Sequence, residues 1–106
     1  MNTAHIYVIG SGNPHTRKGF ARVLIEQDSR KRPVIFNYEE TTYKRSQIQG
    51  MIDAVLQLDC PHHVVFISAS PLALEKAEIA KGCTYAFDFR AGKGKEINKL
   101  LADHNV

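Results

Sequence analysis

An uninterrupted apolar run near the start of the chain constrains the fold more than any other stretch. Residues 6–9 read IYVI, and residues 10–14 read GSGNP. An apolar run that ends in turn-forming residues is typical of a strand covered on both faces, at the centre of a sheet. Glycines after such a strand predict a turn whose backbone approaches a neighbouring group closely. Binding sites of α/β domains usually lie at the carboxyl end of a central strand, so we look for function there.

The next two segments predict an antiparallel hairpin. Alternation over residues 18–27 predicts a half-buried strand, with Ala21, Val23 and Ile25 on one face. After a polar turn that reads DSRKRP, residues 33–38 are the expected return strand. Pro33 at the start of this strand favours a position at the edge of the sheet.

The second half of the chain predicts alternating helices and strands. A helix over residues 44–58 is expected to be capped by Thr41 or Thr42. Strands are predicted at 63–68 and 84–90, a short helix at 72–81, and a last helix at 96–104. The apolar residues predicted to face the core are Ile48, Met51, Ile52, Val55 and Leu56 in the first helix, and Ile97, Leu100 and Leu101 in the last.

The order of elements, β-β-β-α-β-α-β-α, predicts an α/β fold with a five-stranded mixed sheet flanked by helices. With 106 residues, the chain is expected to form a single domain over residues 1–106. No apolar run approaches the roughly 20 residues that span a bilayer, and the first residues lack the pattern of a signal peptide. We therefore expect a cytoplasmic protein without a membrane partner.

Cysteine content and charge narrow the range of sites. Cys60 and Cys83 are the only cysteines, which are too few and too far apart for a zinc site. Two free thiols are expected in a reducing compartment, and whether the two cysteines pair is left open. The net charge is +3, and its cations cluster at residues 17–18, 30–32, 44–45 and 93–95. Clustered cations attract polyanions, although they also occur on ordinary solvated surfaces.

Four short motifs, in this order along the chain, resemble the ribonuclease H family, specifically its type-one hybrid nuclease. IYVIGS followed by GNP resembles the opening strand of that family, and TTYKRSQIQGMIDAV resembles the start of its first long helix. VVFISAS resembles the fourth strand, and TYAFDFRAGKGKEINKLL resembles the fifth strand with its loop and closing helix. The resemblance covers nearly the whole chain, although the segment between the fourth and fifth strands is much shorter here. It implies a ribonuclease H-like fold.

The resemblance also implies a domain that has lost its catalytic acids. Carboxylates of the family hold two Mg²⁺ ions, which activate water for an in-line displacement. The matching positions of this chain carry neutral side chains: Ile9, Gln47, Ala69 and Asn98, or Ile97 if the last match slips by one residue. We therefore predict an inactive homologue without a catalytic residue, a metal ion or another cofactor.

The family holds a hybrid duplex by its minor groove, through polar groups and backbone amides that contact 2′-hydroxyls and phosphates. The polar pair of the family is Tyr43-Lys44 here, which is a departure from its pattern. By resemblance we expect binding of RNA, DNA or a hybrid. The residues expected to bind it are Asn13, Thr42, Lys44, Arg45, Ser68 and Ser70, with Arg17, Lys18 and Lys93 as additional cations on loops.

Two other functions stay open. A protein-interaction or homo-oligomerisation module would use an apolar depression at Ile9 and Ala69, or pair a second copy along the edge strand at residues 33–38. A residual nuclease would need a relocated metal ion held by Asp88.

Overall fold

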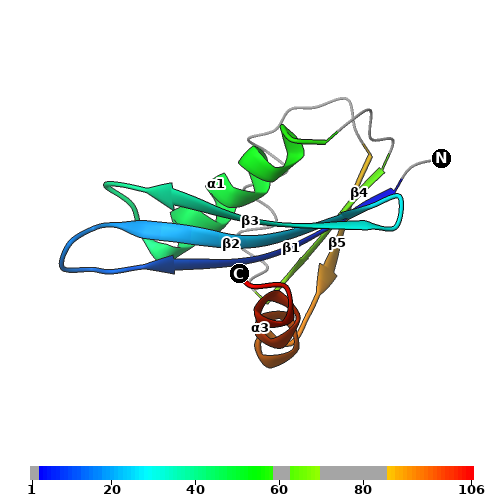
Figure 1. The fold of residues 1–106 in the computed structure, drawn as a ribbon. Helices are drawn as coiled ribbons and strands as arrows, with labels where there is room; N and C mark the ends of the chain where they lie inside the picture. Colours follow the sequence, from blue (N-terminus) through cyan, green and yellow to red (C-terminus); the bar gives the residue numbers. More distant parts are fainter. Residues whose placement is uncertain (1–2, 59–62, 70–85) are drawn as a thin grey trace.

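The computed structural model describes residues 3–58, 63–69 and 86–106 (Figure 1). Five strands form one mixed sheet in the order β3-β2-β1-β4-β5. β1, β2 and β3 pair antiparallel, whereas β4 is parallel to β1 and β5 is parallel to β4. The bounds are β1 Thr3–Gly12, β2 Gly19–Gln27, β3 Arg30–Tyr38, α1 Tyr43–Val55, β4 His63–Ser68, β5 Ala86–Ala91 and α3 Gly94–Asp103. The predicted α/β class and five-stranded mixed sheet are confirmed, while Cys60, Cys83 and the predicted helix at 72–81 lie outside the described residues.

The two helices lie on opposite faces of the sheet, with β1 at its centre (Figure 1). On the α1 face, Ile6 and Val8 of β1 join a buried cluster with Met51 of the helix. On the α3 face, Leu24, Val65 and Ile67 pack against Ile97 and Leu101. The prediction of a central strand covered on both faces is therefore confirmed, and so is the inward side of the last helix.

The predicted glycine-rich turn at residues 10–14 begins later than expected, because residues 10–12 continue β1. Gly10 pairs with Ala21 and Gly12 with Gly19 in the ladder with β2. A Cβ at Gly10 would lie 2.4 Å from the carbonyl oxygen of Tyr43, and one at Gly12 would lie 2.6 Å from the nitrogen of Tyr43. The glycines thus allow the first turn of α1 to rest against the strand, which is the close approach that glycine permits.

The hairpin between β2 and β3 also differs from the prediction. Its turn consists of Asp28 and Ser29 alone, with φ of 52° and 64°. Two consecutive positive φ values are typical of a type I′ turn, which suits the twist of a two-residue hairpin. Arg30–Arg32 therefore belong to β3 rather than to a polar turn, and Pro33 is the fourth residue of the strand. The predicted edge position of this strand is confirmed.

The buried face of α1 is rotated from the predicted apolar stripe. Thr42 caps the helix, as predicted, by accepting a hydrogen bond from the backbone nitrogen of Arg45. Leu56 follows the helix and is 69% exposed, so its predicted core position is wrong. The buried residues of the helix are Ser46, Gln47, Gly50, Met51, Ala54 and Val55. At Gly50 the helix lies especially close to β2, because an added Cβ there would be 2.4 Å from the Cβ of Ala21.

Tyr38 joins the edge strand β3 to α1. Its hydroxyl donates to Oδ2 of Asp53 over 2.6 Å, and Nε2 of Gln49 donates to Oδ1 of the same carboxylate over 3.0 Å. Burial, followed by the bond to Asp53, raises the pKa of the Tyr38 hydroxyl well above its usual value. The folded state therefore retains this proton at a pH where the unfolded chain loses it.

We expect Tyr38→Phe to lower the free energy of unfolding by about 1–2 kcal/mol near neutral pH, because the Asp53 carboxylate loses a donor. Since the folded pKa is raised, the contribution of Tyr38 is fully present below about pH 10 and declines above it. In urea unfolding, the difference between wild type and variant should therefore stay constant from about pH 7 to about pH 9 and narrow as the pH rises past about 10. Tyr43→Phe, at an exposed site, is the control. A difference that stays constant with pH would contradict this account.

Candidate nucleic-acid interface

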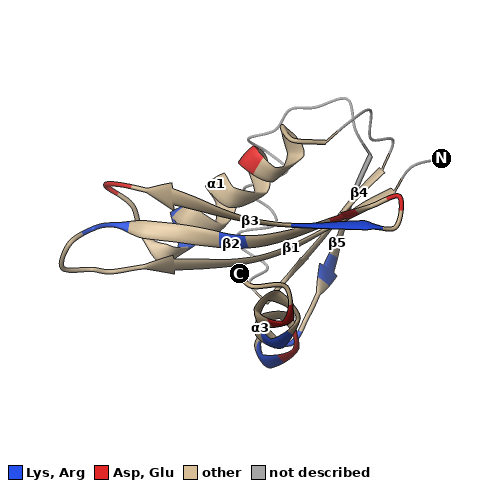
Figure 2. Ribbon diagram, viewed as in Figure 1, with Lys and Arg blue, Asp and Glu red and all other residues tan. Residues whose placement is uncertain are grey.

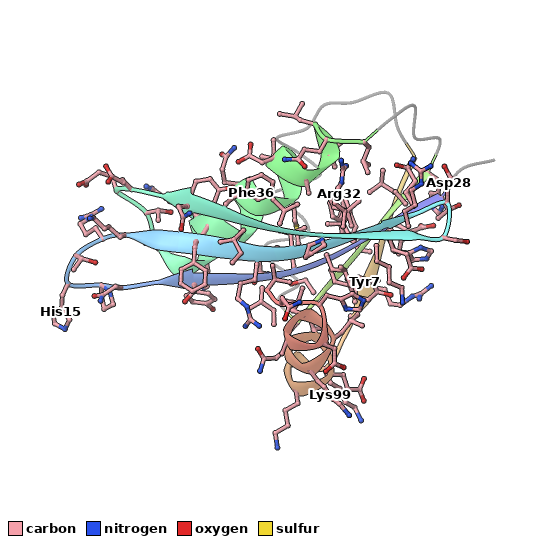
Figure 3. All side chains as sticks on the ribbon, viewed as in Figure 1. Tyr7, His15, Asp28, Arg32, Phe36 and Lys99 are labelled. Atoms are coloured by element: carbon pink, nitrogen blue, oxygen red, sulfur yellow. The ribbon has the colours of Figure 1, made fainter. Side chains whose placement is uncertain are left out.

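The loop between β1 and β2 is held by its own hydrogen bonds. Oδ1 of Asn13 accepts from the backbone nitrogens of His15 at 2.8 Å and Thr16 at 3.3 Å. The backbone nitrogen of Asn13 donates to the carbonyl of Lys18, and that of Arg17 donates to the carbonyl of Asn13, both over 2.8 Å. Arg17 adopts a φ of 60°. This compact loop leaves its side chains outside, with His15 at the far tip (Figure 3).

The first turn of α1 lies beside this loop. The backbone nitrogen of Thr41 donates to the carbonyl of Arg17 over 2.8 Å, which ties the two segments together. Lys44 and Arg45 follow the Thr42 cap and are exposed. The first turn contains no acidic residue, so these cations add to the positive end of the helix dipole. We call the surface formed by Asn13, Arg17, Lys18, Thr42, Lys44 and Arg45 the basic end.

The cations of the basic end differ in their surroundings. Nε of Arg17 lies 3.6 Å from Oε2 of Glu40, and both side chains are well exposed. Arg45 lines a hollow together with Glu39 and Glu40. Lys18 and Lys44 form no ion pair with another residue that the structure describes. These two lysines are therefore the cations most available to an anionic partner.

An aromatic residue that the sequence reasoning missed lies next to Lys18. Phe20 is 37% exposed and lines an open hollow of about 600 Å³ with Asn13, His15 and Lys18. Tyr43, in the first turn of α1, is 49% exposed. Exposed aromatic rings beside cations offer stacking surfaces for unpaired bases. The alternation of side chains in β2 puts Phe20 on the face opposite Ala21, which is the face that α3 packs on. Only the position of α3 shows that this part of the face is exposed.

Gln47 is a buried link between three elements. Its side chain is 5% exposed, and its Nε2 donates to Oγ of Ser68 over 2.6 Å. Its Oε1 accepts from the backbone nitrogen of Gly10 over 3.3 Å. The amide thereby joins α1 to β1 and to β4. Ser68 is 1% exposed, so it lies inside the protein and not on the predicted binding surface.

Ile9 lies on the other face of β1 and packs at the margin of the cluster under α3. Its cross-strand partner is Arg22 of β2. Nε and Nη2 of Arg22 donate to the carbonyl oxygen of Val106 over 2.9 and 2.5 Å, and Nη1 donates to Oδ1 of Asn98 over 2.6 Å. A guanidinium thus lies beside Ile9, where it would repel a divalent cation.

The remaining predicted positions are dispersed. Ala69 directly follows β4 and is exposed. Lys93 is exposed on the α3 side of the sheet, at a hollow of about 380 Å³ that Tyr7 and Arg90 also line. Figure 2 shows the basic residues of α3 on the opposite side of the sheet from those of α1. Ser70 lies outside the described residues.

Asp88, the acid that a relocated metal ion would need, lies in an ion pair with His63. Oδ2 of Asp88 lies 2.6 Å from Nε2 of His63, at the amino end of β4, so this acid is directed away from the Gln47–Ser68 contact. Over the three described stretches of chain, no three His, Cys, Asp or Glu side chains gather to form a potential metal site.

No protein-family model matches the chain, and no curated protein matches it. Within residues 3–58, 63–69 and 86–106, neither helix is long and apolar enough to cross a membrane.

Proposed function

We propose that this chain is a ribonuclease H-like domain that binds nucleic acid through the basic end and does not hydrolyse it. The observation that carries the proposal is the hydrogen bond between Thr41 and Arg17, which brings two basic segments onto one surface. Cations gathered in this way neutralise several phosphates at once and release their counterions. The element order of the described residues supports the ribonuclease H-like part of the proposal.

The proposed binding mode is electrostatic, with stacking as a second contribution. Lys18 and Lys44 supply cations without a described carboxylate partner, and Phe20 and Tyr43 expose aromatic rings close to them. Contacts of this kind read the backbone and the base faces rather than base edges. We therefore expect little sequence preference and a dissociation constant in the micromolar range at moderate salt, on the order of 10⁻⁴–10⁻⁶ M.

The proposed lack of hydrolysis rests on the side chains at the positions of the acids. Gln47 uses both ends of its amide to link β1 and β4, so it acts as a structural contact. Ile9 packs under α3, and the Arg22 guanidinium lies beside it. A metal-assisted displacement needs negative ligands at this place, whereas this chain supplies neutral groups and a cation.

We expect the double variant Lys18→Gln/Lys44→Gln to bind a labelled single strand or hybrid about tenfold more weakly than wild type at low salt. Losing two phosphate contacts should also reduce the slope of log affinity against log salt concentration by about 1.5. Fluorescence anisotropy at several salt concentrations measures both quantities. The folded state should be unaffected, since neither lysine forms an ion pair with another described residue.

The matched control is Lys95→Gln/Lys99→Gln, which removes the same charge from exposed positions of α3. Its affinity should stay within about twofold of wild type. Equal weakening by both pairs would show a general charge effect and reject the basic end as the site. Release of labelled fragments from a hybrid in Mg²⁺ or Mn²⁺, above a buffer control, would reject the proposed lack of hydrolysis.

A second candidate function is self-association along β3. This strand is a sheet edge, and Ile35 on it is 49% exposed, close to the exposed Phe20 on β2. One feature argues against self-association: the first half of β3 carries Arg30–Arg32 and Pro33. Charged residues and proline on an edge strand disfavour pairing with a second strand. Sedimentation of the free protein separates the two functions: a dimer that Ile35→Lys dissociates, without salt-sensitive binding of nucleic acid, would favour self-association.

A further inference from the structure

The tip of the β2–β3 hairpin extends beyond the end of α1 and borders a cavity. Direct pairing in the ladder joins Ile25 to Arg32 and Gln27 to Arg30, so these four side chains share one face of the sheet. Ile25 identifies this face as the one that α1 covers further along the strands. Because α1 ends at Val55, no helix among the described residues covers this face near the turn. The cavity measures about 330 Å³ and is lined by Ile25, Gln27, Asp28, Arg30 and Arg32.

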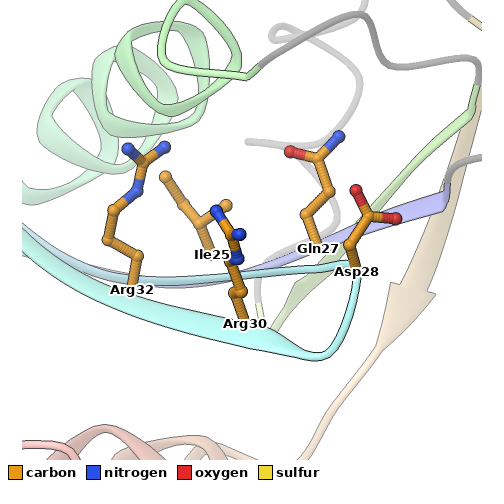
Figure 4. Close-up of a pocket in the computed structure, with 5 residues that line it drawn as sticks. All are labelled: Ile25, Gln27, Asp28, Arg30 and Arg32. Atoms are coloured by element: carbon orange, nitrogen blue, oxygen red, sulfur yellow. The ribbon is translucent and has the colours of Figure 1, made fainter.

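The two arginines of this cavity are held differently. Nη2 of Arg32 donates to the carbonyl oxygen of Gln57 over 2.8 Å. The last turn of α1 has no basic residue of its own, so Arg32 supplies the cation that favours a helix carboxyl end. This contact orients the Arg32 guanidinium at the wall of the cavity. Figure 4 shows both arginines rising from the same side of the hairpin, with Arg32 next to α1.

Arg30 has no comparable contact. Its side chain forms no hydrogen bond or ion pair with another residue that the structure describes, and Asp28 forms no ion pair with either arginine. Arg30 and Arg32 are two residues apart on one strand face, so their Cα atoms lie roughly 7 Å apart. Guanidiniums that project from neighbouring positions on one face repel each other, and an anion bound between them would attract both. The pair is therefore arranged for an anionic ligand.

We propose that this cavity, the hairpin pocket, binds a phosphate monoester between the guanidiniums of Arg30 and Arg32. The planar fork of arginine matches phosphate oxygens with two parallel hydrogen bonds. The volume is at the small end of ligand sites, and buried Ile25 gives the pocket an apolar floor. The Asp28 carboxylate disfavours ligands of higher charge, so a monoester is preferred over a polyphosphate. The pocket lies at the opposite end of the sheet from the basic end (Figure 3).

Titration of ¹⁵N-labelled protein with inorganic phosphate, at constant ionic strength, tests the proposal. The amides of residues 25–32 should show saturable shifts with a dissociation constant in the millimolar range, on the order of 1 mM. Arg30→Gln should weaken this binding by about tenfold or more, because a charged hydrogen-bond donor is lost. Arg30→Lys should weaken it severalfold, since the charge remains but the fork is lost. The test uses variants of Arg30 rather than Arg32, because Arg32→Gln would also remove the hydrogen bond to the carbonyl oxygen of Gln57.

The matched control is Lys31→Gln, which removes the same charge from the same strand. Lys31 lies on the opposite face of the sheet, directly across the ladder from Glu26. Its phosphate affinity should stay within about twofold of wild type. The absence of saturable shifts up to about 50 mM phosphate, or equal weakening by Lys31→Gln and Arg30→Gln, would overturn the proposal. The Lys18→Gln/Lys44→Gln variant should retain the shifts, so the hairpin pocket and the basic end are tested separately.

Two further titrations distinguish the sources of the phosphate. A nucleoside 5′-monophosphate represents a small ester, and a 5′-phosphorylated oligonucleotide, compared with its 5′-hydroxyl form, represents the end of a nucleic acid. Shifts at residues 25–32 that need the terminal phosphate of either ligand support the hairpin pocket. A nucleoside triphosphate that binds more tightly than the monophosphate would contradict the role given to Asp28.

Discussion

Replacing Phe66 by alanine is expected to lower the free energy of unfolding by about 3–5 kcal/mol, as large-to-small changes of buried aromatic residues do. Phe66 is 2% exposed and belongs to the buried cluster between the sheet and α1. Its ring stacks on that of Phe89, with centroids 5.5 Å apart and planes inclined by 15°. The variant would lose the transfer free energy of the ring and leave a cavity that the strands on either side cannot close.

Urea unfolding measures this loss as a lower midpoint with an unchanged slope. The matched control is Phe20→Ala, the same substitution at a site that is 37% exposed, where the loss should stay below about 1 kcal/mol. A domain of this size has a total stability of only about 5–15 kcal/mol, so Phe66→Ala is expected to approach the limit of folding. Similar losses for both variants would mean that the core does not lie where the structure has it.

Gly50→Ala is the second large expected effect, at about 2–3 kcal/mol of destabilisation. A Cβ at Gly50 would lie 2.4 Å from the Cβ of Ala21, well inside van der Waals contact. Neither atom belongs to a flexible side chain, so α1 has to move away from β2 and its packing against Val8 and Val23 loosens. This cost outweighs the gain of about 1 kcal/mol that alanine usually brings to a helix interior.

Gly94→Ala provides the opposite case within the same protein. A Cβ at Gly94, the first residue of α3, would meet nothing within 4 Å. Removing a glycine from the unfolded chain should then leave stability unchanged or raise it by up to about 1 kcal/mol. Thermal or urea unfolding measures the change in stability of both variants. A stabilised Gly50→Ala would contradict the close packing of α1 on β2.

Phe66→Ala and Gly50→Ala both disturb the packing of α1 on the sheet. The same packing positions the basic end, which is the proposed binding surface. The Lys44 and Arg45 side chains depend on the position of α1, and Gly10 and Gly12 set how closely its first turn approaches β1. Gln47 then fixes the helix to β1 and β4 through its amide. The Gln47 amide is thus a contact that supports the fold of this chain.

The pattern of apolar residues predicted most of the strands correctly. The run at residues 6–9 identified the central strand, and the alternation over residues 18–27 gave the faces of β2. These predictions succeeded because the pleat of a strand alternates its side chains in a fixed way, whatever lies above or below. Pro33 likewise indicated an edge strand, since a residue without an N–H fits poorly into the middle of a sheet.

The ends of elements were predicted less well, for reasons that lie outside the local pattern. Gly10 and Gly12 looked like turn residues, but they are strand residues against which α1 packs. Arg30–Arg32 looked like part of a turn, but the short Asp28–Ser29 turn left them in the ladder. At Gly10 and Gly12 the packing of α1 selected the strand, whereas at Arg30–Arg32 the two-residue turn selected the ladder.

By itself the sequence determined an α/β chain with a central buried strand, a basic character and neutral side chains at Ile9, Gln47 and Ala69. Only the tertiary structure decided that Arg22 reaches Asn98 and Val106, which are 76 and 84 residues away in the chain. It also decided that small residues of α1 face the sheet and that the basic segments at Arg17 and Thr41 meet. Periodicity records only which side of its own element a residue occupies, whereas these contacts depend on how the elements pack against each other.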